Sequence, residues 1–166
     1  MPLSPLSERN DFSAVIIRTD FTDEAAWRRV TAQLESSSHH HRDLRKHYVV
    51  IDSPELAHAD TDTILTALSA RKDLNGRISV VFVADSATMR AAHHALLAIR
   101  TLTRKDLGDD THEVVVGFGR EFRTVPGAVN EIHANLQLAN MNFEDFSSVA
   151  REDSEGVFRA ELSTVD

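Results

Sequence analysis

The chain has 166 residues, a length that fits one domain with a sizeable core. It contains no cysteine, which excludes disulfides, thiolate catalysis and cysteine-ligated zinc sites. With 18 Lys and Arg against 26 Asp and Glu, its formal net charge is −8, which argues against nucleic acid and anionic membranes as partners.

The N-terminal segment predicts no packed structure. Residues 1–12 contain two prolines and no hydrophobic periodicity, so we expect a flexible arm there. The first residues lack the basic start and apolar run of a signal peptide, and no window approaches the roughly 18 apolar residues of a membrane span. We therefore expect a soluble cytoplasmic protein with a single domain over residues 13–160 and a short tail over 161–166.

Short, nearly continuous apolar runs in the first half of the chain predict strands that are buried on both faces. These runs are Ala14–Ile17, Tyr48–Ile51 and Ile78–Ala84. Between them, Thr22 predicts the start of one helix, and Asp60 or Thr61 predicts the start of another. Such alternation is typical of a parallel sheet covered by helices.

The second half begins with a predicted long helix. Asp85 or Ser86 caps it, and its core-facing residues recur at helical spacing, namely Met89, Ala92, Leu96, Ile99 and Thr103. Later elements are, in order, strands at Val114–Phe118 and Phe122–Val125, a helix from Pro126, a helix capped by Asn142 with Asp145, and an edge segment around Val157–Phe158.

Together these elements predict a three-layer α/β fold with a mostly parallel sheet. The expected strand order is 2-1-3-4, where the fourth strand is Val114–Phe118. The Phe122–Val125 strand is expected to lie antiparallel at one edge. At least four strands should be parallel, with the first strand central.

A candidate site follows from this topology, because open parallel sheets bind ligands beyond the carboxyl ends of their strands. The residues expected there are Arg18, Thr19, Asp20, Asp52, Asp85 and Ser86. Their three carboxylates and one arginine could bind a divalent metal, hold a polar ligand or carry out acid–base chemistry. The alternative is that the aspartates are ordinary turn and capping residues. Arg18 favours a site, because a charged residue at the end of a buried strand needs a partner or an opening.

Familiar cofactor and nucleophile motifs are missing from the sequence. The adjacent histidines His39–His41 and His93–His94 lack the one-turn spacing of a fixed metal site, and His133 lies alone on an apolar helix face. There is no nucleophile-elbow serine, no dinucleotide loop and no phosphate-loop lysine. We therefore expect no metal and no organic cofactor.

The stretch His133–Phe146 reads as two helices that meet at an amide-rich joint. Asn135, Asn140 and Asn142 are crowded there among apolar residues. Asparagine suits helix ends better than helix interiors. We expect the joint to be structural, with Asn135 and Asn140 buried and bonded to neighbouring loops.

Three segments carry a resemblance to a known family, and they are Val15–Trp27, Arg120–Pro126 and Asn135–Phe146. The chain resembles a family of small microbial proteins catalogued as a domain of unknown function. That family has a strand ending Arg-Thr-Asp-Phe and a later motif, Asn-Leu-x-x-Ala-Asn-Met-Asp-Phe-Glu-x-Phe. Here Asn142 replaces the usual aspartate, which keeps the capping role. The resemblance directs attention to Arg18, Asp20, Arg123, Asn135 and Asn140, and it implies no reaction.

Two functions stay open at this stage. The first is an enzyme that acts on a small molecule without a cofactor, as an isomerase, cyclase or lyase. Asp20 or Asp85 would be its acid or base, and Arg18 or Arg123 would hold an anionic group. Residues assigned to substrate contact are Thr19, Asp52, Ser86, Arg123, Asn135 and Asn140. The second is a non-catalytic interaction or regulatory module that binds a protein partner or a second copy of the chain.

Overall fold

The computed structural model describes residues 13–38, 48–70, 78–101, 120–138 and 140–159. Its strands are β1 (Ala14–Arg18), β2 (Tyr48–Ile51), β3 (Val80–Ala84), β4 (Leu96–Arg100), β5 (Glu121–Thr124) and β6 (Val157–Phe158). Its α-helices are α1 (Glu24–Ser38), α2 (Thr61–Ser69), α3 (Ser86–Arg90), α5 (Val129–Gln137) and α6 (Phe143–Glu152). Two short 3₁₀ turns are η2 (Pro54–Leu56) and η4 (Pro126–Ala128).

The six strands form one mixed sheet in the order β2-β1-β3-β4-β5-β6. β1 pairs in parallel with both β2 and β3, and β5 pairs in parallel with β6. β4 is antiparallel to both of its neighbours. Within the described residues, it is therefore the one strand that runs against the others. The α/β class and the predicted order of the first three strands are confirmed.

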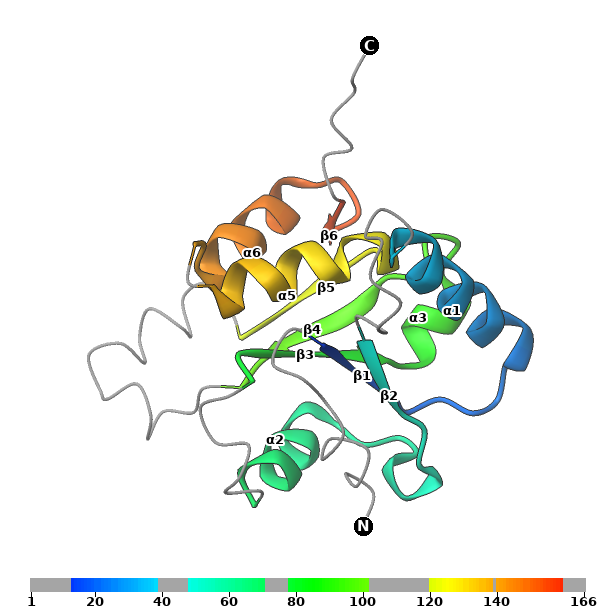
Figure 1. Cartoon of the computed structure of the whole chain (residues 1–166). Coiled ribbons are helices and arrows are strands. Elements are labelled where there is room, and N and C mark those ends of the chain that lie inside the picture. Colours follow the sequence, from blue (N-terminus) through cyan, green and yellow to red (C-terminus); the bar gives the residue numbers. More distant parts are fainter. Residues whose placement is uncertain (1–12, 39–47, 71–77, 102–119, 139, 160–166) are drawn as a thin grey trace.

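Alternation of side chains along the strands divides the core between the two faces of the sheet. Ala14 and Ile16 of β1 belong to a cluster with residues of α1, α5 and α6, whereas Val15 and Ile17 pack with residues of η2 and α2. Figure 1 shows the same division, with α1, α5 and α6 above the sheet and α2 below it. β1 is buried along its whole length, as its apolar run predicts.

The predicted long helix after β3 is wrong. Helix α3 spans only Ser86–Arg90, and Leu96–Arg100 is instead strand β4, next to β3. Leu96, Ala98 and Ile99 are almost fully buried by neighbours on both sides of the strand. Residues spaced three and four apart fitted a helix by coincidence, whereas the continuous run Leu96–Ile99 suits an interior strand.

Two further expectations about the sheet change. The strand predicted at Phe122–Val125 is β5, and it pairs with β6, so it is not at the edge. It runs in the same direction as β1 and β3, and the strand that is antiparallel to the others is β4. The edge is the short Val157–Phe158 segment, as predicted. The predicted strand at Val114–Phe118 lies outside the described residues, and the position beside β3 belongs to β4.

Helix starts agree closely with the capping residues in the sequence. Asp60 caps α2 by accepting from the Thr63 backbone N–H, and Asp85 caps α3 by accepting from that of Thr88. α6 starts after Asn142, whose backbone N–H donates to the Asp145 carboxylate. α1 differs slightly, because Asp23 rather than Thr22 accepts from the Ala26 N–H at its start. Within the described residues, no helix has the length and apolar character that a membrane crossing needs.

Candidate functional site at the strand ends

The candidate site is the edge of the sheet where β1, β2 and β3 end, called here the strand-end rim. Its residues are Arg18, Thr19, Asp20, Asp52, Asp85 and Ser86. α1 leaves β1 over one face of the sheet, and the path from β2 to β3 runs through α2 on the other face. The rim between β1 and β3 is thus a switch point of the kind where α/β proteins bind ligands.

Arg18 is the last residue of β1, and its side chain is only 3% exposed. Nε donates to the backbone oxygen of Asp20 at 2.9 Å, and Nη2 donates to Glu24 Oε1 at 2.7 Å. Nη1 lies 3.7 Å from Asp52 Oδ1, which is an ion-pair distance longer than a hydrogen bond. The guanidinium is therefore neutralised by two side chains that are themselves 62% and 49% exposed.

Two aromatic rings complete the surroundings of Arg18. Its Cζ lies over the Phe21 ring at 4.7 Å from the centroid and over the Trp27 ring at 4.9 Å. Contacts of this kind stabilise a cation by attraction to the ring faces. Together with the bond to the Asp20 backbone, they hold the guanidinium in one place at the end of the strand.

Asp20 does not form a side-chain ion pair with Arg18. Its Oδ1 accepts from the Thr22 N–H at 2.8 Å and from the Thr22 hydroxyl at 2.6 Å. These two hydrogen bonds lower the pKa of Asp20, and the nearby His58 and Arg90 act in the same direction. Asp20 is therefore an ionised turn residue at neutral pH.

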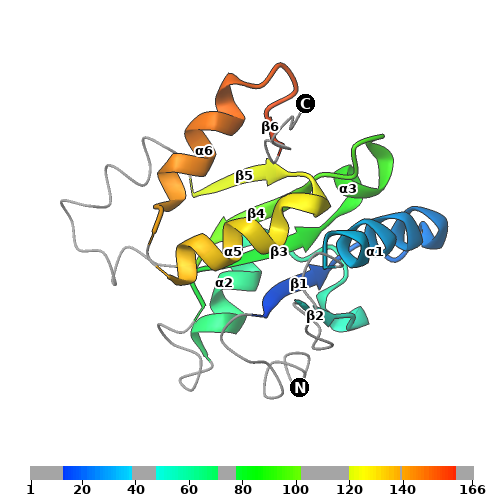
Figure 2. The same ribbon diagram turned by 45° about the horizontal axis from the view of Figure 1, so that its top comes forward.

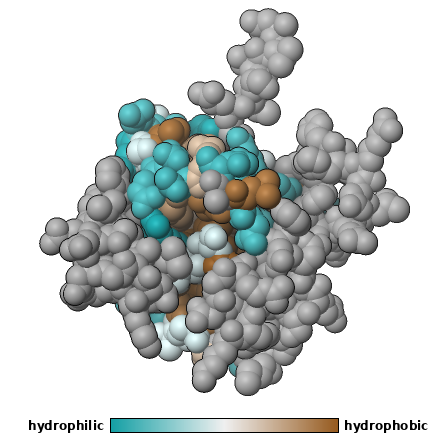
Figure 3. Space-filling view, turned by 60° about the vertical axis from the view of Figure 1, so that its left-hand side comes forward, coloured by the Kyte–Doolittle hydropathy of each residue, from teal (hydrophilic) through white to brown (hydrophobic). Residues whose placement is uncertain are grey.

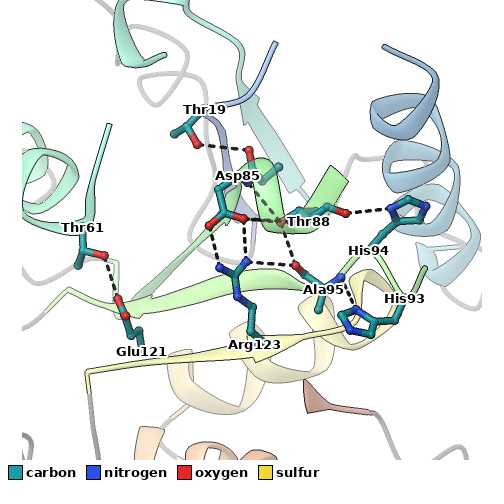
Figure 4. A network of polar contacts seen from close by, with 10 residues as sticks. Thr19, Thr61, Asp85, Thr88, His93, His94, Ala95, Glu121 and Arg123 are labelled. Carbon is teal, nitrogen blue, oxygen red and sulfur yellow. Dashed lines mark hydrogen bonds and ion pairs between the residues drawn. The ribbon is translucent and has the colours of Figure 1, made fainter. Parts of the chain in front are cut away.

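Asp85 pairs with Arg123 instead of Arg18. Its two oxygens accept from the two terminal nitrogens of Arg123, each at 2.8 Å. Burial raises the pKa of Asp85, but the bonds from Arg123 and Thr88 outweigh it and the net shift is downward. In Figure 4, Arg123 reaches up from β5 to the Asp85 carboxylate, close to the Ala95 carbonyl.

The turn between α3 and β4 extends this network. The Thr88 hydroxyl lies 2.8 Å from the Ala95 carbonyl, and the His94 ring Nδ1 contacts the Thr88 carbonyl at 2.9 Å. His93 Nδ1 accepts from the Ala95 N–H, and its Nε2 lies 3.6 Å from Glu155. His94 has a φ of 51°, in the left-handed region that residues other than glycine rarely adopt. Figure 4 shows both histidines beyond the Asp85–Arg123 pair.

The other predicted rim residues have lesser roles. Thr19 is buried, and its N–H and hydroxyl both donate to the Ala84 carbonyl, which joins the ends of β1 and β3. Ser86 is exposed at the first position of α3. No group of three or more His, Asp or Glu side chains in the described parts of the chain is placed to hold a metal ion.

The amide-rich joint is not part of the rim. It lies at the opposite end of the sheet, where α5 ends and α6 begins (Figures 1 and 2). The expectation that Asn135 and Asn140 are buried is wrong. Asn140 is exposed, and Asn135 is half-buried and donates to the Glu131 carbonyl of its own helix. What closes the joint is the Asn135 backbone carbonyl, which accepts from the Asn140 N–H.

Comparison with known families agrees with the resemblance seen in the sequence. The family described as Domain of unknown function (DUF6924) matches residues 13–161. The chain belongs to this family. No curated protein matches the chain. The family match takes in the whole strand-end rim and carries no reaction with it.

Three of the residues that surround Arg18 are not among the predicted site residues. Glu24 is its closest carboxylate partner, and the Phe21 and Trp27 rings cover its guanidinium. All three lie within nine positions of Arg18, so a signal was present in the sequence. In the sequence, Glu24 looks like an acid at a helix start and Trp27 like a core residue. In the structure each keeps that role and also contacts Arg18.

Proposed function

We propose that this protein binds a small anionic molecule at Arg18 in the strand-end rim. The observation that carries the proposal is the mismatch in exposure between Arg18 and its partners. The arginine is 3% exposed, whereas the carboxylate bonded to it belongs to Glu24, which is 62% exposed.

This mismatch matters because a buried cation is costly to desolvate, and a well-packed apolar side chain is often more stable in its place. Arg18 is fixed by β1, by the Asp20 carbonyl and by two rings, whereas its counter-charges are on surface side chains. A ligand anion could replace Glu24 without any change to the sheet. Arginine suits this role, because its fork of N–H donors matches anionic oxygens.

Acid–base catalysis receives less support than binding. A general acid or base works best with a pKa near the working pH. The pKa values of Asp20 and Asp85 are both lowered, and both carboxylates are already occupied by internal donors. We therefore propose a binding protein ahead of an isomerase, cyclase or lyase. We propose a cytoplasmic location. The cytoplasm is reducing, and a chain without cysteine has no disulfide that could be lost there.

Trp27 provides a direct test, because it is the only tryptophan in the chain and its ring contacts Arg18. Trp27 fluorescence would be titrated with acetate, succinate, phosphate and sulfate at constant ionic strength. We expect a saturable change that is lost in Arg18→Met and kept in Arg28→Met, a matched change at an exposed position of α1. An equal response in both variants, or no response to any of these anions in the native protein, would contradict the proposal.

A second candidate function is an interaction module centred on the α5–α6 joint. Leu138, Met141 and Val149 are 57%, 36% and 48% exposed, although all are large and apolar. Figure 3 views the face that includes this joint, and there hydrophobic areas are separated by hydrophilic ones. That pattern favours a small contact rather than a broad one. Sedimentation velocity on the native protein and on Leu138→Glu tests self-association, and an unchanged monomer in both removes the dimer version.

A further inference from the structure

The proposed anion site has a geometry that restricts its ligand. Resting on that proposed function, we propose that the ligand presents a carboxylate, and that Glu24 occupies the place of this carboxylate in the free protein. Glu24 would then compete with the ligand for Arg18 and so weaken ligand binding.

The hydrogen bonds of Arg18 define which part of its guanidinium is available. Nε is bonded to the Asp20 backbone, so it is fixed by the fold. The two terminal nitrogens face the Glu24 and Asp52 carboxylates, at 2.7 Å and 3.7 Å. The available edge therefore carries two N–H-bearing nitrogens side by side, which is the arrangement that binds a carboxylate through both of its oxygens.

The aromatic rings favour a planar anion over a tetrahedral one. Phe21 and Trp27 both lie close to Arg18 Cζ, so an anion must approach along the edge that bears Nη1 and Nη2. Ring faces carry partial negative charge, and they repel oxygen atoms that project toward them. All atoms of a carboxylate lie in one plane, whereas phosphate and sulfate place oxygens outside it. The rim thus selects a carboxylate.

Glu24 already makes one of the two contacts that such a ligand would make, the one to Nη2. It belongs to the first turn of α1, and its carboxylate reaches Arg18 from a side chain that is mostly in solvent. Rotation of that side chain releases the guanidinium without unfolding the helix, because Asp23 rather than Glu24 caps the start of α1. A ligand must therefore displace a carboxylate that is tethered at high effective concentration.

The experiment compares the native protein with Glu24→Gln, which keeps the size of the side chain and removes its charge. Glu152→Gln, at the exposed end of α6, is the matched control. Trp27 fluorescence is titrated with acetate and with phosphate. Glycylglycine and its C-terminal amide are added to distinguish a free small acid from the carboxyl end of a peptide. Arg18→Met and Arg18→Lys define the signal that depends on the guanidinium, and thermal unfolding verifies that each variant is folded.

We expect acetate to bind more tightly than phosphate and to bind Glu24→Gln about fivefold more tightly than the native protein. Glu152→Gln should bind like the native protein. If glycylglycine binds more tightly than acetate and its amide does not bind, the ligand carboxylate belongs to the end of a peptide. If acetate binds more tightly than glycylglycine, the carboxylate belongs to a free small acid.

Two failures can be told apart. If phosphate binds as well as acetate, or if Glu24→Gln fails to tighten acetate binding while Arg18→Met abolishes it, the carboxylate inference is overturned and the anion site stands. If Arg18→Met and Arg18→Lys bind the anions like the native protein, the anion site itself is overturned. The inference that Glu24 competes with the ligand is then overturned as well.

Discussion

Asp85 and Arg123 are joined by two hydrogen bonds, each 2.8 Å long. The pair links the end of β3 to β5 across the intervening strand β4. Asp85 follows β3, and Arg123 lies on β5 opposite Leu97 of β4. The same carboxylate caps helix α3. One ion pair therefore connects the ends of two strands that are not neighbours with the start of a helix.

This pair predicts a measurable coupling energy. In a double-mutant cycle with Asp85→Asn and Arg123→Met, urea unfolding should give a coupling of about 1–3 kcal/mol, because the pair is bidentate and about a quarter exposed. The exposed pair of Arg159 and Glu155 is the control, with an expected coupling below about 0.5 kcal/mol. Strictly additive effects at Asp85 and Arg123 would show that the pair contributes nothing.

Acid should remove the stability that Asp85 contributes. Its pKa in the folded protein is lowered from the usual 3.8, so its ionised form is favoured by folding. The contribution is fully present above pH 3.8 and is lost as the pH falls through the lower folded pKa. The difference in unfolding free energy between the native protein and Asp85→Asn should be constant from about pH 5 to 8 and should shrink below about pH 4. A difference that grows with acid would contradict the assignment.

The aromatic cluster beneath α6 should dominate the stability of that half of the domain. Phe146 is 1% exposed, stacks on Phe122 at 6.4 Å and meets Phe158 edge-on at 5.2 Å. Phe146→Ala should cost about 3–5 kcal/mol in chemical denaturation, because it leaves a cavity. Val149→Ala, on the exposed side of the same helix, should cost less than about 0.5 kcal/mol. Similar losses of unfolding free energy for the two changes would contradict the orientation of α6, in which Phe146 faces the sheet and Val149 faces away from it.

The joint between α5 and α6 should tolerate loss of its exposed amide. Asn140→Ala should change the free energy of unfolding by less than about 0.5 kcal/mol, because its side chain is exposed. The hydrogen bond that closes the joint comes from the Asn140 backbone, so Asn140→Pro should be much more damaging. Thermal unfolding of both variants checks this contrast, and a large cost for Asn140→Ala would reveal a side-chain role.

The elements predicted best from the sequence are those whose residue pattern fits only one type of secondary structure. Continuous apolar runs gave β1, β2 and β3, and capping residues gave the starts of α2, α3 and α6. The run Leu96–Ile99 has two readings, because a short apolar segment fits a helix face as well as a buried strand. The strand was identifiable only from its pairing with β3 and β5.

The candidate site divides in the same way. Placement of Arg18, Asp20 and Asp85 at one edge follows from the direction of the strands. The choice of partner does not, because it depends on register and reach, and Arg123 finds Asp85 across an intervening strand. Composition likewise cannot show whether an asparagine is buried, which is why the prediction for Asn140 failed.

The reversed direction of β4 has a consequence for how the chain folds. β3 and β4 are adjacent in sequence and pair without a crossover, whereas β1 pairs with β2 and β3 only across much longer segments. Closing a short loop loses less chain entropy than closing a long one, so contacts between β3 and β4 can form early. This hairpin lies in the middle of the chain and at the centre of the sheet. It therefore offers one free edge to β1 and the other to β5, and folding can proceed from the inside of the sequence toward both ends.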